Sequence, residues 1–248
     1  MAKKFTLLGC PLKHSMSPQI HARLFEILGI SAEYSLTEIP PESLAENISL
    51  LKTFDGFNVT IPHKIAIIPF LDRLDETAKR YGAVNCVKNE NGRLIGYNTD
   101  CIGFLRGLSS GGASLGGKVL LLGCGGAGRM MAAEAILHDC DLTVAVREGS
   151  LQKTDEVISL LKNLKNSSAA RVVDSDKIDG DFDILLNSTP VGMYPKTGVS
   201  PTTDEVISRC KFVFDAVYNP EKTELLRRAE MLGKRTIGGM SMLVFQAA

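Results

Sequence analysis

Short apolar runs alternate with segments of helical periodicity along the whole chain. The first three runs lie at residues 5–8, 32–36 and 54–59, and each has the length of a buried strand. Strands that alternate with helical segments are typical of α/β folds in which most strands are parallel. The pattern therefore predicts an α/β fold.

Two helices are predicted between these strands. Ser17 followed by Pro18 indicates a helix start, with Ser17 as the N-cap and Pro18 in the first helical position. Over residues 41–51 the apolar side chains recur at helical spacing on one stripe. This spacing predicts an amphipathic helix that covers the sheet.

A hairpin is predicted next. Apolar segments at 83–88 and 94–97 flank Asn91-Gly92, a pair that favours a two-residue turn between antiparallel strands. The sheet of the first half should therefore be mixed.

The second half repeats the α/β pattern. Residues 109–117 are rich in Ser and Gly and form the most linker-like stretch, so we place a domain boundary after residue 110. An apolar strand follows at 118–122, and further strands are predicted at 142–146, 184–187 and 212–216.

Composition excludes several classes of protein. The 248 residues include 44% apolar residues, enough for ordinary cores, and 28 basic residues balance 28 acidic ones. Bulk charge therefore gives no indication of nucleic-acid or membrane binding. The start of the chain carries no signal-peptide pattern, and no apolar stretch reaches the length of a membrane span. We expect a soluble cytoplasmic protein.

The six cysteines point to the same compartment. None forms a C-x-x-C pair, and no Cys/His cluster has zinc-ligand spacing, so we expect free thiols and no metal site. His14 and His21 have no partner pattern for metal binding, and we interpret both as structural.

A glycine-rich turn follows the strand at 118–122. Gly123, Gly125 and Gly128 have the G-x-G-x-x-G spacing, with a helical pattern after them. Such glycines permit a tight turn and a close approach of the backbone to a pyrophosphate at the helix N-terminus. Glycine turns also serve helix packing alone, but the strand before and the helix after favour dinucleotide binding.

The residues after the next strand normally select the cofactor. Arg147 favours NADP because its guanidinium can pair with a 2′-phosphate. The adjacent Glu148 opposes this, since a carboxylate repels that phosphate and can bind the ribose hydroxyl of NAD. Alternatively, Arg147 and Glu148 form a solvated ion pair on a loop and have no role in cofactor binding.

Lys64 and Asp100 end two motifs, at 58–64 and 96–100, that precede the glycine turn. A cation and a carboxylate that face a nicotinamide suit hydride transfer at an alcohol carbon, because the carbonyl oxygen gains charge as hydride arrives. The alternatives are plain: most lysines are surface charges, and residues 98–100 form a good N-cap sequence before an apolar helix.

Ser15 and Ser17 place two hydroxyls at a predicted helix N-terminus. This location suits a carboxylate ligand. Ordinary capping by Ser17 explains the same residues equally well.

Together these segments resemble the shikimate dehydrogenase family over nearly the whole chain. The resemblance is carried, in order, by the motifs at 11–18, 58–64, 82–85, 96–103, 123–128, 187–193, 215–220 and 238–247. It implies an N-terminal mixed α/β substrate domain (residues 1–110), a C-terminal Rossmann-type dinucleotide-binding domain (residues 111–237), and the start of a C-terminal helix that returns to the substrate domain (residues 238–248).

The resemblance also implies an activity: reversible NADP-dependent reduction of 3-dehydroshikimate to shikimate, in aromatic amino-acid biosynthesis, by a monomer or homodimer. It implies that Lys64 and Asp100 are catalytic. It implies substrate binding by Ser15, Ser17, Asn58, Thr60, Asn85, Tyr218 and Gln246. It implies cofactor binding by Gly123, Gly125, Gly126, Ala127, Gly128, Arg147, Thr189, Met193 and Gly239.

Three positions depart from the family pattern. The usual Asn-Arg-Thr after the second nucleotide-domain strand reads Val146-Arg147-Glu148, Cys86 replaces a threonine, and the chain ends at Ala248 within an expected helix.

Glu148 keeps an NAD-dependent quinate/shikimate dehydrogenase open as an alternative. A non-catalytic nucleotide-binding sensor on the same scaffold is another, although it could lose Lys64 or Asp100 without penalty. A methylenetetrahydrofolate dehydrogenase would need a pocket for a flat pterin, which the absence of Trp disfavours.

Overall fold

The computed structural model describes residues 2–13, 15–165 and 169–247, and its chain divides into two compact units. The first unit is Met1–Thr99 with Ala247–Ala248, and the second is Asp100–Gln246. The division falls before helix α5 (Asp100–Ser110) rather than after residue 110, because Phe104 of α5 packs edge-on against Phe214 at 5.3 Å within the second unit. The predicted assignment of functions to the two units stays a prediction.

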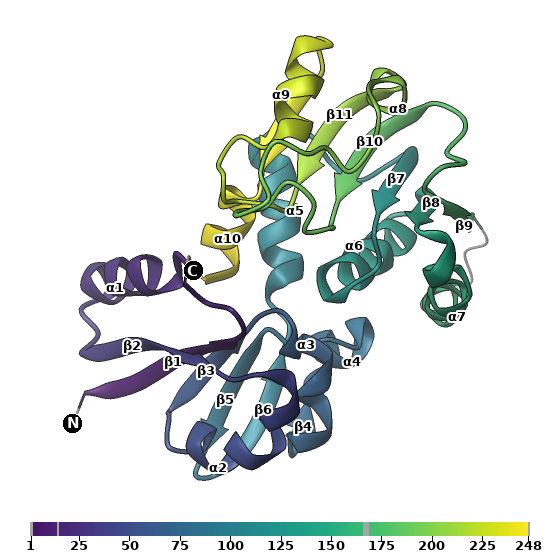
Figure 1. Ribbon diagram of the computed structural model, residues 1–248. Helices are drawn as coiled ribbons and strands as arrows, with labels where there is room; N and C mark the ends of the chain where they lie inside the picture. Colours follow the sequence, from purple (N-terminus) through teal and green to yellow (C-terminus); the bar gives the residue numbers. More distant parts are fainter. Residues whose placement is uncertain (1, 14, 166–168, 248) are drawn as a thin grey trace. The chain divides into compact units, whose positions relative to one another are not determined.

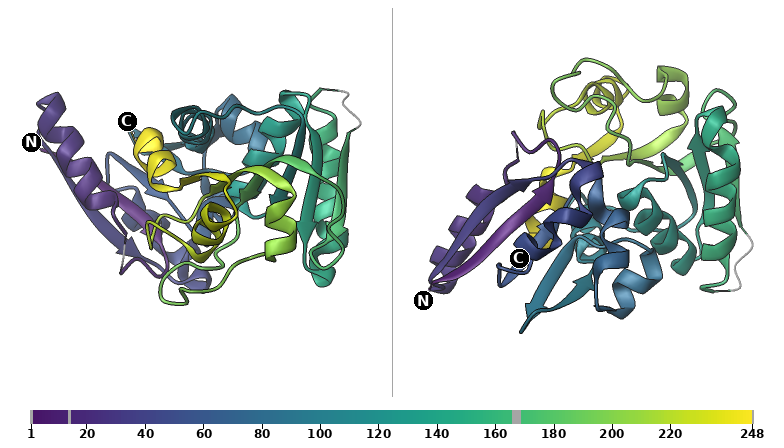
Figure 2. Two further views of the ribbon diagram at one scale, coloured as in Figure 1. Left: turned by 90° about the horizontal axis from the view of Figure 1, so that it is seen from above. Right: turned by 60° about the horizontal axis from the view of Figure 1, so that its bottom comes forward.

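The first unit contains a mixed six-stranded sheet in the order β2-β1-β3-β5-β6-β4 (Figure 1). Strands β1, β2 and β3 are parallel, whereas β5 pairs antiparallel with both β3 and β6. Both views of Figure 2 show α1 beside the ribbons of β1 and β2. The elements of the first unit are β1 (Lys3–Gly9), α1 (Ser17–Leu28), β2 (Ala32–Glu38), η1 (Pro41–Ser43), η2 (Ala45–Asn47), α2 (Ile48–Leu51), β3 (Gly56–Val59), α3 (His63–Ala66), η3 (Ile68–Phe70), β4 (Arg73–Leu74), α4 (Glu76–Tyr81), β5 (Cys86–Glu90) and β6 (Arg93–Tyr97).

The predicted hairpin is confirmed. Asn91 and Gly92 adopt φ values of 55° and 87° between β5 and β6, the positive values that a type I′ turn requires at both central residues. The predicted mixed sheet follows from this turn.

The single helix predicted over 41–51 is wrong. The segment forms two short 3₁₀ turns and one α-helical turn, η1, η2 and α2. The Asn47 side chain donates to the carbonyl oxygen of Ser43 at 2.8 Å, a local bond that competes with helix propagation. The apolar stripe is still buried at Leu44 and Leu51, so the amphipathic pattern identified the buried face but not the regular helix.

The second unit contains a six-stranded sheet in the order β12-β11-β10-β7-β8-β9, with every pair parallel. This is the strand order of dinucleotide-binding Rossmann folds, and its topological switch point lies between β7 and β10. Its elements are α5, β7 (Lys118–Leu122), α6 (Gly126–Leu137), β8 (Asp141–Val146), η4 (Glu148–Ser150), α7 (Leu151–Lys162), β9 (Ala170–Asp174), β10 (Phe182–Asn187), α8 (Asp204–Ser208), β11 (Cys210–Asp215), α9 (Glu224–Met231), β12 (Arg235–Gly238) and α10 (Met240–Ala247).

Successive side chains along the central strands point to opposite faces of this sheet, and both faces are buried. Leu120 and Leu122 join a buried cluster with α8 and α9, whereas the intervening Leu121 is fully buried outside that cluster. Strands buried on both faces read as continuous apolar runs, which is why the segment 118–122 was predicted correctly. No helix among the described residues is long and apolar enough to cross a membrane.

Candidate active site

In the first unit, the loops after β1 and β3 are joined at the carboxyl edge of the sheet. Thr60 donates its backbone N–H to Leu8 O at 2.8 Å, and Cys10 donates to Ile61 O at 3.1 Å. A Cβ added to Gly9 would lie 2.5 Å from Cγ2 of Thr60, so only glycine permits this approach. The two loops therefore hold Thr60 in a fixed position beside the chain that leads to Ser15.

Lys64 lies in the single turn of α3 and is half-buried. Its backbone carbonyl accepts the N–H of Val84 at 2.8 Å. The preceding His63 is fully buried, with Nε2 at 2.6 Å from Ile39 O, which makes Nε2 the protonated ring nitrogen. Contacts on both sides of Lys64 thus fix its backbone.

Asn58, Asn85 and Thr99 form a second polar group in this unit. Asn85 is buried, and its Oδ1 accepts the N–H of Thr99 at 2.8 Å while its Nδ2 donates to Thr99 Oγ1 at 3.0 Å. Nδ2 of Asn58 donates to the backbone oxygen of Asn85 at 3.3 Å. Two carboxamides and a hydroxyl therefore gather near the carboxyl end of β3, as ring-hydroxyl recognition would require.

The prediction that Ser17 is an N-cap is wrong. Helix α1 begins at Ser17 itself, its N-cap is Met16, and no side chain caps it. The backbone N–H of Ser17 donates instead to Oγ of Ser15 at 3.2 Å, because Ser15 lies two residues upstream at the helix entry. Both serines lie at the helix N-terminus as predicted, and His14 between Lys13 and Ser15 lies outside the described residues.

Tyr34 is a polar group of this site that the sequence interpretation missed. Its phenol donates to Oδ1 of Asn58 at 2.8 Å, and its ring stacks on His21 with centroids 4.1 Å apart. Burial raises the pKa of the Tyr34 phenol, the nearby Cys86 thiol raises it further, and a hydrogen bond with Ser17 lowers it. Tyr34 thus touches two predicted substrate-binding residues. Its place on an edge strand gave no motif by which to find it.

His21 is packed against this tyrosine, as its structural interpretation requires. Burial lowers the pKa of His21 from 6.5 to about 4, so the ring is neutral at pH 7 and stacks as an uncharged aromatic.

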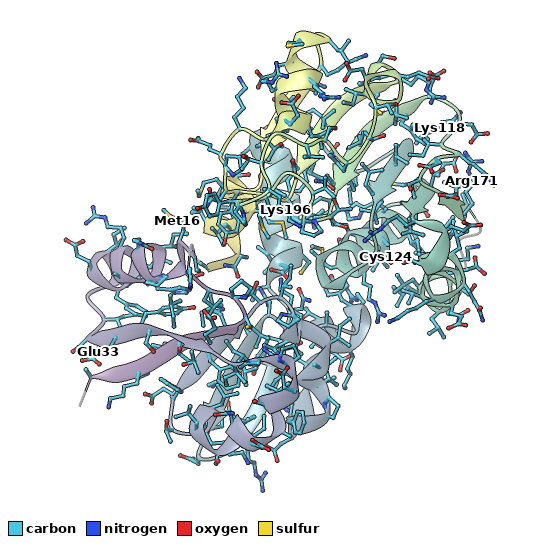
Figure 3. The ribbon with its side chains drawn as sticks, in the orientation of Figure 1. Met16, Glu33, Lys118, Cys124, Arg171 and Lys196 are labelled. Carbon is cyan, nitrogen blue, oxygen red and sulfur yellow. The ribbon has the colours of Figure 1, made fainter. Side chains whose placement is uncertain are left out.

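In the second unit, the glycine turn joins β7 to α6 as predicted. Gly123 has φ of 86°, which favours glycine, and a Cβ on Gly128 would lie 2.6 Å from Oγ of Ser188. Gly125 is the N-cap of α6, and Gly126 and Ala127 are its first two residues. Figure 3 labels Lys118 and Cys124 near the two ends of β7.

Open space lies beside this turn. A Cβ on Gly125 would meet nothing within 4 Å, so the first N–H groups of α6 are not covered by a side chain at that position. Burial raises the pKa of the adjacent Cys124 thiol, and Arg129 lowers it. A helix N-terminus with uncovered N–H groups fits a pyrophosphate.

Arg147 and Glu148 follow β8 and are both exposed. Arg147 is extended, with φ of −64° and ψ of 148°, and Glu148 begins η4. Both side chains can therefore reach a ribose bound past the end of β8, and their opposite charges leave the cofactor preference open on geometry alone.

The loop after β10 is fixed by a side chain on the strand. Thr189 donates its backbone N–H and its hydroxyl to Oδ1 of Asn187, at 3.0 and 2.7 Å. Oγ of Ser188 donates to Leu122 O at 2.9 Å, which ties this loop to the glycine turn. Met193 further along is exposed, where a flat ring could lie against it.

Tyr218 follows β11, Gly239 precedes α10, and Gln246 lies in the last turn of α10. Gly239 donates its N–H to Val217 O at 3.2 Å, and a Cβ on Gly239 would collide with the carbonyl of Ala216. Asp100 is buried in the first turn of α5, and Gly103 admits α10 so closely that a Cβ there would lie 2.8 Å from Cβ of Gln246. Asp100, Tyr218 and Gln246 are thus carried by one unit.

The structure places Ser15, Ser17, Asn58, Thr60, Lys64 and Asn85 in the first unit and the remaining predicted residues in the second. The pairing of Lys64 with Asp100, and the role of each residue, stay predictions. Within residues 2–13, 15–165 and 169–247, no cluster of three His, Cys, Asp or Glu side chains could hold a metal ion.

Comparisons with known proteins point to one family. The family model described as the shikimate dehydrogenase substrate binding domain matches residues 7–87. A shikimate dehydrogenase (NADP(+)) from Shouchella clausii is 38% identical over 256 residues, which cover 100% of this chain and 91% of that protein. A shikimate dehydrogenase solved in complex with NADP⁺ superposes with a TM-score of 0.92 at 35% identity, covering 100% of this chain and 88% of the other. The Thermus thermophilus enzyme, solved with NADP(H) and shikimate, gives 0.88 at 34% identity, covering 99% and 90%.

Proposed function

Because the chain belongs to the shikimate dehydrogenase family, we propose that it catalyses the reversible NADP-dependent interconversion of 3-dehydroshikimate and shikimate. The observation that carries this proposal is similarity over the full chain to NADP(+)-dependent relatives, with Lys64 and Asp100 both present at their motif positions. This reaction belongs to aromatic amino-acid biosynthesis, and we expect the protein in the cytoplasm as a monomer or homodimer.

Lys64 and Asp100 are proposed to serve the reacting oxygen. When bound, NADPH supplies a hydride to the carbonyl carbon. The Lys64 ammonium stabilises the negative charge that develops on the oxygen, and it can deliver the proton that completes the alcohol. Asp100 accepts a hydrogen bond from a ring hydroxyl of the substrate. The fixed backbone around Lys64 supports this role, since proton transfer requires a positioned donor.

Substrate orientation is proposed to depend on two sets of polar groups. Ser15, Ser17 and Tyr218 hold the carboxylate through neutral hydroxyl donors. The ring hydroxyls meet carboxamides and a hydroxyl, supplied by Asn58, Thr60, Asn85 and Gln246. The hydrogen bonds that already link Asn58 and Asn85 support this assignment, because a linked pair is pre-ordered for its ligand.

Cofactor binding is proposed at the carboxyl edge of β7, β8 and β10. The glycine turn fits a pyrophosphate, because Cβ atoms are missing where the backbone must pass closely and the N-terminus of α6 is uncovered. Arg147 is proposed to bind the 2′-phosphate, and Thr189 and Met193 are proposed to lie beside the nicotinamide. Gly239 is proposed to contact the cofactor through its backbone. Glu148 favours a second candidate, an NAD-dependent quinate/shikimate dehydrogenase.

A spectrophotometric assay separates these candidates. Reduced-nicotinamide absorbance is followed with shikimate or quinate, each with NADP and with NAD. We expect the highest kcat/KM for shikimate with NADP. A higher kcat/KM with NAD would assign the second candidate, and no turnover with any pair would leave the nucleotide-binding sensor as the better interpretation.

A further inference from the structure

A buried carboxylate, Asp215, lies at the carboxyl end of β11 and takes no part in the functions proposed above. It is 0% exposed and accepts three hydrogen bonds. Nδ2 of Asn187 donates to Oδ1 at 2.8 Å, the N–H of Val217 donates to Oδ1 at 3.0 Å, and the hydroxyl of Thr223 donates to Oδ2 at 2.6 Å. An ionised side chain is expensive to bury unless such partners satisfy it.

The three partners indicate the charge state of this group. The amide and the backbone N–H can only donate, and Oγ1 of Thr223 already accepts the N–H of Leu226 at the start of α9. A protonated carboxyl could donate only to the second lone pair of Thr223 Oγ1, whereas an ionised Asp215 accepts all three bonds directly. These contacts therefore favour the carboxylate. Burial raises its pKa, and the bonds from Thr223, Val217 and Asn187 counter that rise.

One arm of this network reaches the loop after β10. Asn187 lies opposite Asp215 in the β10–β11 register. Because its Nδ2 is committed to Asp215, its Oδ1 is turned away and accepts both the N–H and the hydroxyl of Thr189. The amide orientation that Asp215 imposes therefore sets the position of a proposed cofactor-binding residue.

The other arm reaches the loop that carries Tyr218. Val217 is held through its N–H by Asp215 and through its carbonyl by the N–H of Gly239. The two loops also meet directly, since Tyr194 donates its backbone N–H to Asn219 O at 2.9 Å. Asp215 thus braces the chain on both sides of Tyr218, through Val217 and Thr223, and the chain before Thr189, through Asn187.

We propose that Asp215 is a positioning residue that sets the Tyr218 loop and the Thr189 loop together, so that carboxylate recognition and cofactor recognition depend on one buried charge. This inference rests on the proposed function for the roles of Tyr218 and Thr189. Asp215 touches neither substrate nor cofactor; it acts through Asn187 and Val217.

The substitution Asp215→Asn tests the proposal, because it keeps the size of the side chain and replaces one acceptor with a donor. The KM for shikimate should rise roughly tenfold, the value of one hydrogen bond to a charged group, and the KM for NADP should rise in parallel. In a double-mutant cycle, Tyr218→Phe should cost much less in the Asp215→Asn background than in the parent, because the tyrosine is already misplaced.

The matched control is Asp183→Asn on the neighbouring strand of the same sheet. Asp183 also accepts a backbone N–H, from Lys118 at 2.9 Å, but it lies at the opposite, amino edge. This control should leave both KM values within twofold. Unchanged KM values in Asp215→Asn, or additive losses with Tyr218→Phe, would overturn the proposal. If Asp215→Asn does not fold, Thr223→Val removes one donor to Asp215 together with the N-cap of α9, and it should shift both KM values in the same direction by less.

Hydrogen exchange separates this proposal from the proposed function. Amide protection of peptides covering 187–194 and 216–223 should fall in Asp215→Asn and hold in Asp183→Asn, whether or not shikimate is a substrate. Absence of turnover in the parent protein would overturn the proposed function alone. Retained protection of both peptides in Asp215→Asn would overturn the positioning role alone.

Discussion

The phenol of Tyr34 donates a 2.8 Å hydrogen bond to Oδ1 of Asn58, across strands that both pair with β1. Removing that hydroxyl by Tyr34→Phe keeps the ring stacked on His21 but removes one of the two hydrogen bonds that orient the Asn58 amide. We expect the KM for shikimate to rise severalfold and the free energy of unfolding to fall by about 1 kcal/mol, the net value of one hydrogen bond. Steady-state kinetics and urea unfolding measure the two effects.

A matched control exists on the same strand. Thr37 shares a 2.8 Å hydroxyl–hydroxyl bond with the buried Thr6, and no role in the site is proposed for it. Thr37→Val should lower stability by a similar amount and leave the KM for shikimate unchanged. An equal rise in KM in both variants would show that the tyrosine acts only through the stability of the sheet.

His21 should make stability depend on pH. Its pKa is lowered from 6.5 to about 4 in the folded protein. Between these values the unfolded chain binds a proton that the folded one does not, so stability is full above pH 6.5 and falls as the pH drops toward 4. At 1.36 kcal/mol per pKa unit the upper bound on the loss is on the order of 3 kcal/mol, and solvent at the half-buried ring reduces it.

The variant His21→Phe should keep the stacking on Tyr34 and lose this titration. The difference in unfolding free energy between the variant and the parent should therefore shift in favour of the variant from pH 7 to pH 4.5. A difference that is constant over this range would contradict a neutral buried imidazole.

The central strands were predictable because burial on both faces leaves continuous apolar runs, as at 118–122. The edge strands of the second sheet were not. Strand β12 carries a single large apolar side chain, Ile237, and β9 lies at the other edge of the sheet, where half-exposed positions blur the pattern. The segment 41–51 failed for another reason: periodicity reports which residues face the core, not whether the backbone propagates as one helix.

The residues of the candidate site also differ in how far the sequence could identify them. Gly123 could be named from the spacing of the glycine turn, and Lys64 was named from the resemblance of its motif to the family, with its role still a prediction. Tyr34 was not named, and Asp215 was seen only as part of the motif at 215–220, since their importance depends on partners 24 and 28 residues away, Asn58 and Asn187. Hydrogen bonds between distant strands leave no local sequence pattern.

Lys64→Ala should lower kcat by about 10²–10⁴-fold, the usual contribution of a positioned proton-transfer group, and leave the KM for shikimate within a small factor. Asp100→Asn should impair both parameters, because Asp100 is expected to contact a ring hydroxyl and to serve the same reacting oxygen as Lys64. The double variant should lose much less than the product of the single losses. A kcat for Lys64→Ala within twofold of the parent would remove the lysine from the catalytic step.

Arg147→Ala should raise the KM for NADP more than the KM for NAD, because the exposed guanidinium is expected to pair with the 2′-phosphate. Glu148→Thr should act in the opposite sense and sharpen the preference for NADP by removing a repulsive charge. Initial rates with both cofactors give these ratios. A parent enzyme that prefers NAD, with Arg147→Ala neutral toward both, would assign the second candidate function.

The last prediction concerns the substrate carboxylate, which Ser15, Ser17 and Tyr218 are proposed to hold without a lysine or arginine. Each lost hydrogen bond to a charged group costs about 1.5–3 kcal/mol, and 1.4 kcal/mol is one decade in affinity. Ser15→Ala and Tyr218→Phe should therefore each weaken shikimate binding roughly tenfold or more.

An analogue with a neutral hydroxymethyl group in place of the carboxylate tests whether these hydroxyls bind the charge. The penalty of each variant should vanish on the analogue, whereas equal penalties on both ligands would mean that the residues only pack the site. Ser17→Ala adds a second discrimination. Because Ser17 is the first helical residue and its side chain caps nothing, the variant should weaken binding, whereas a residue that only capped the helix would lower stability by about 1 kcal/mol and leave binding unchanged.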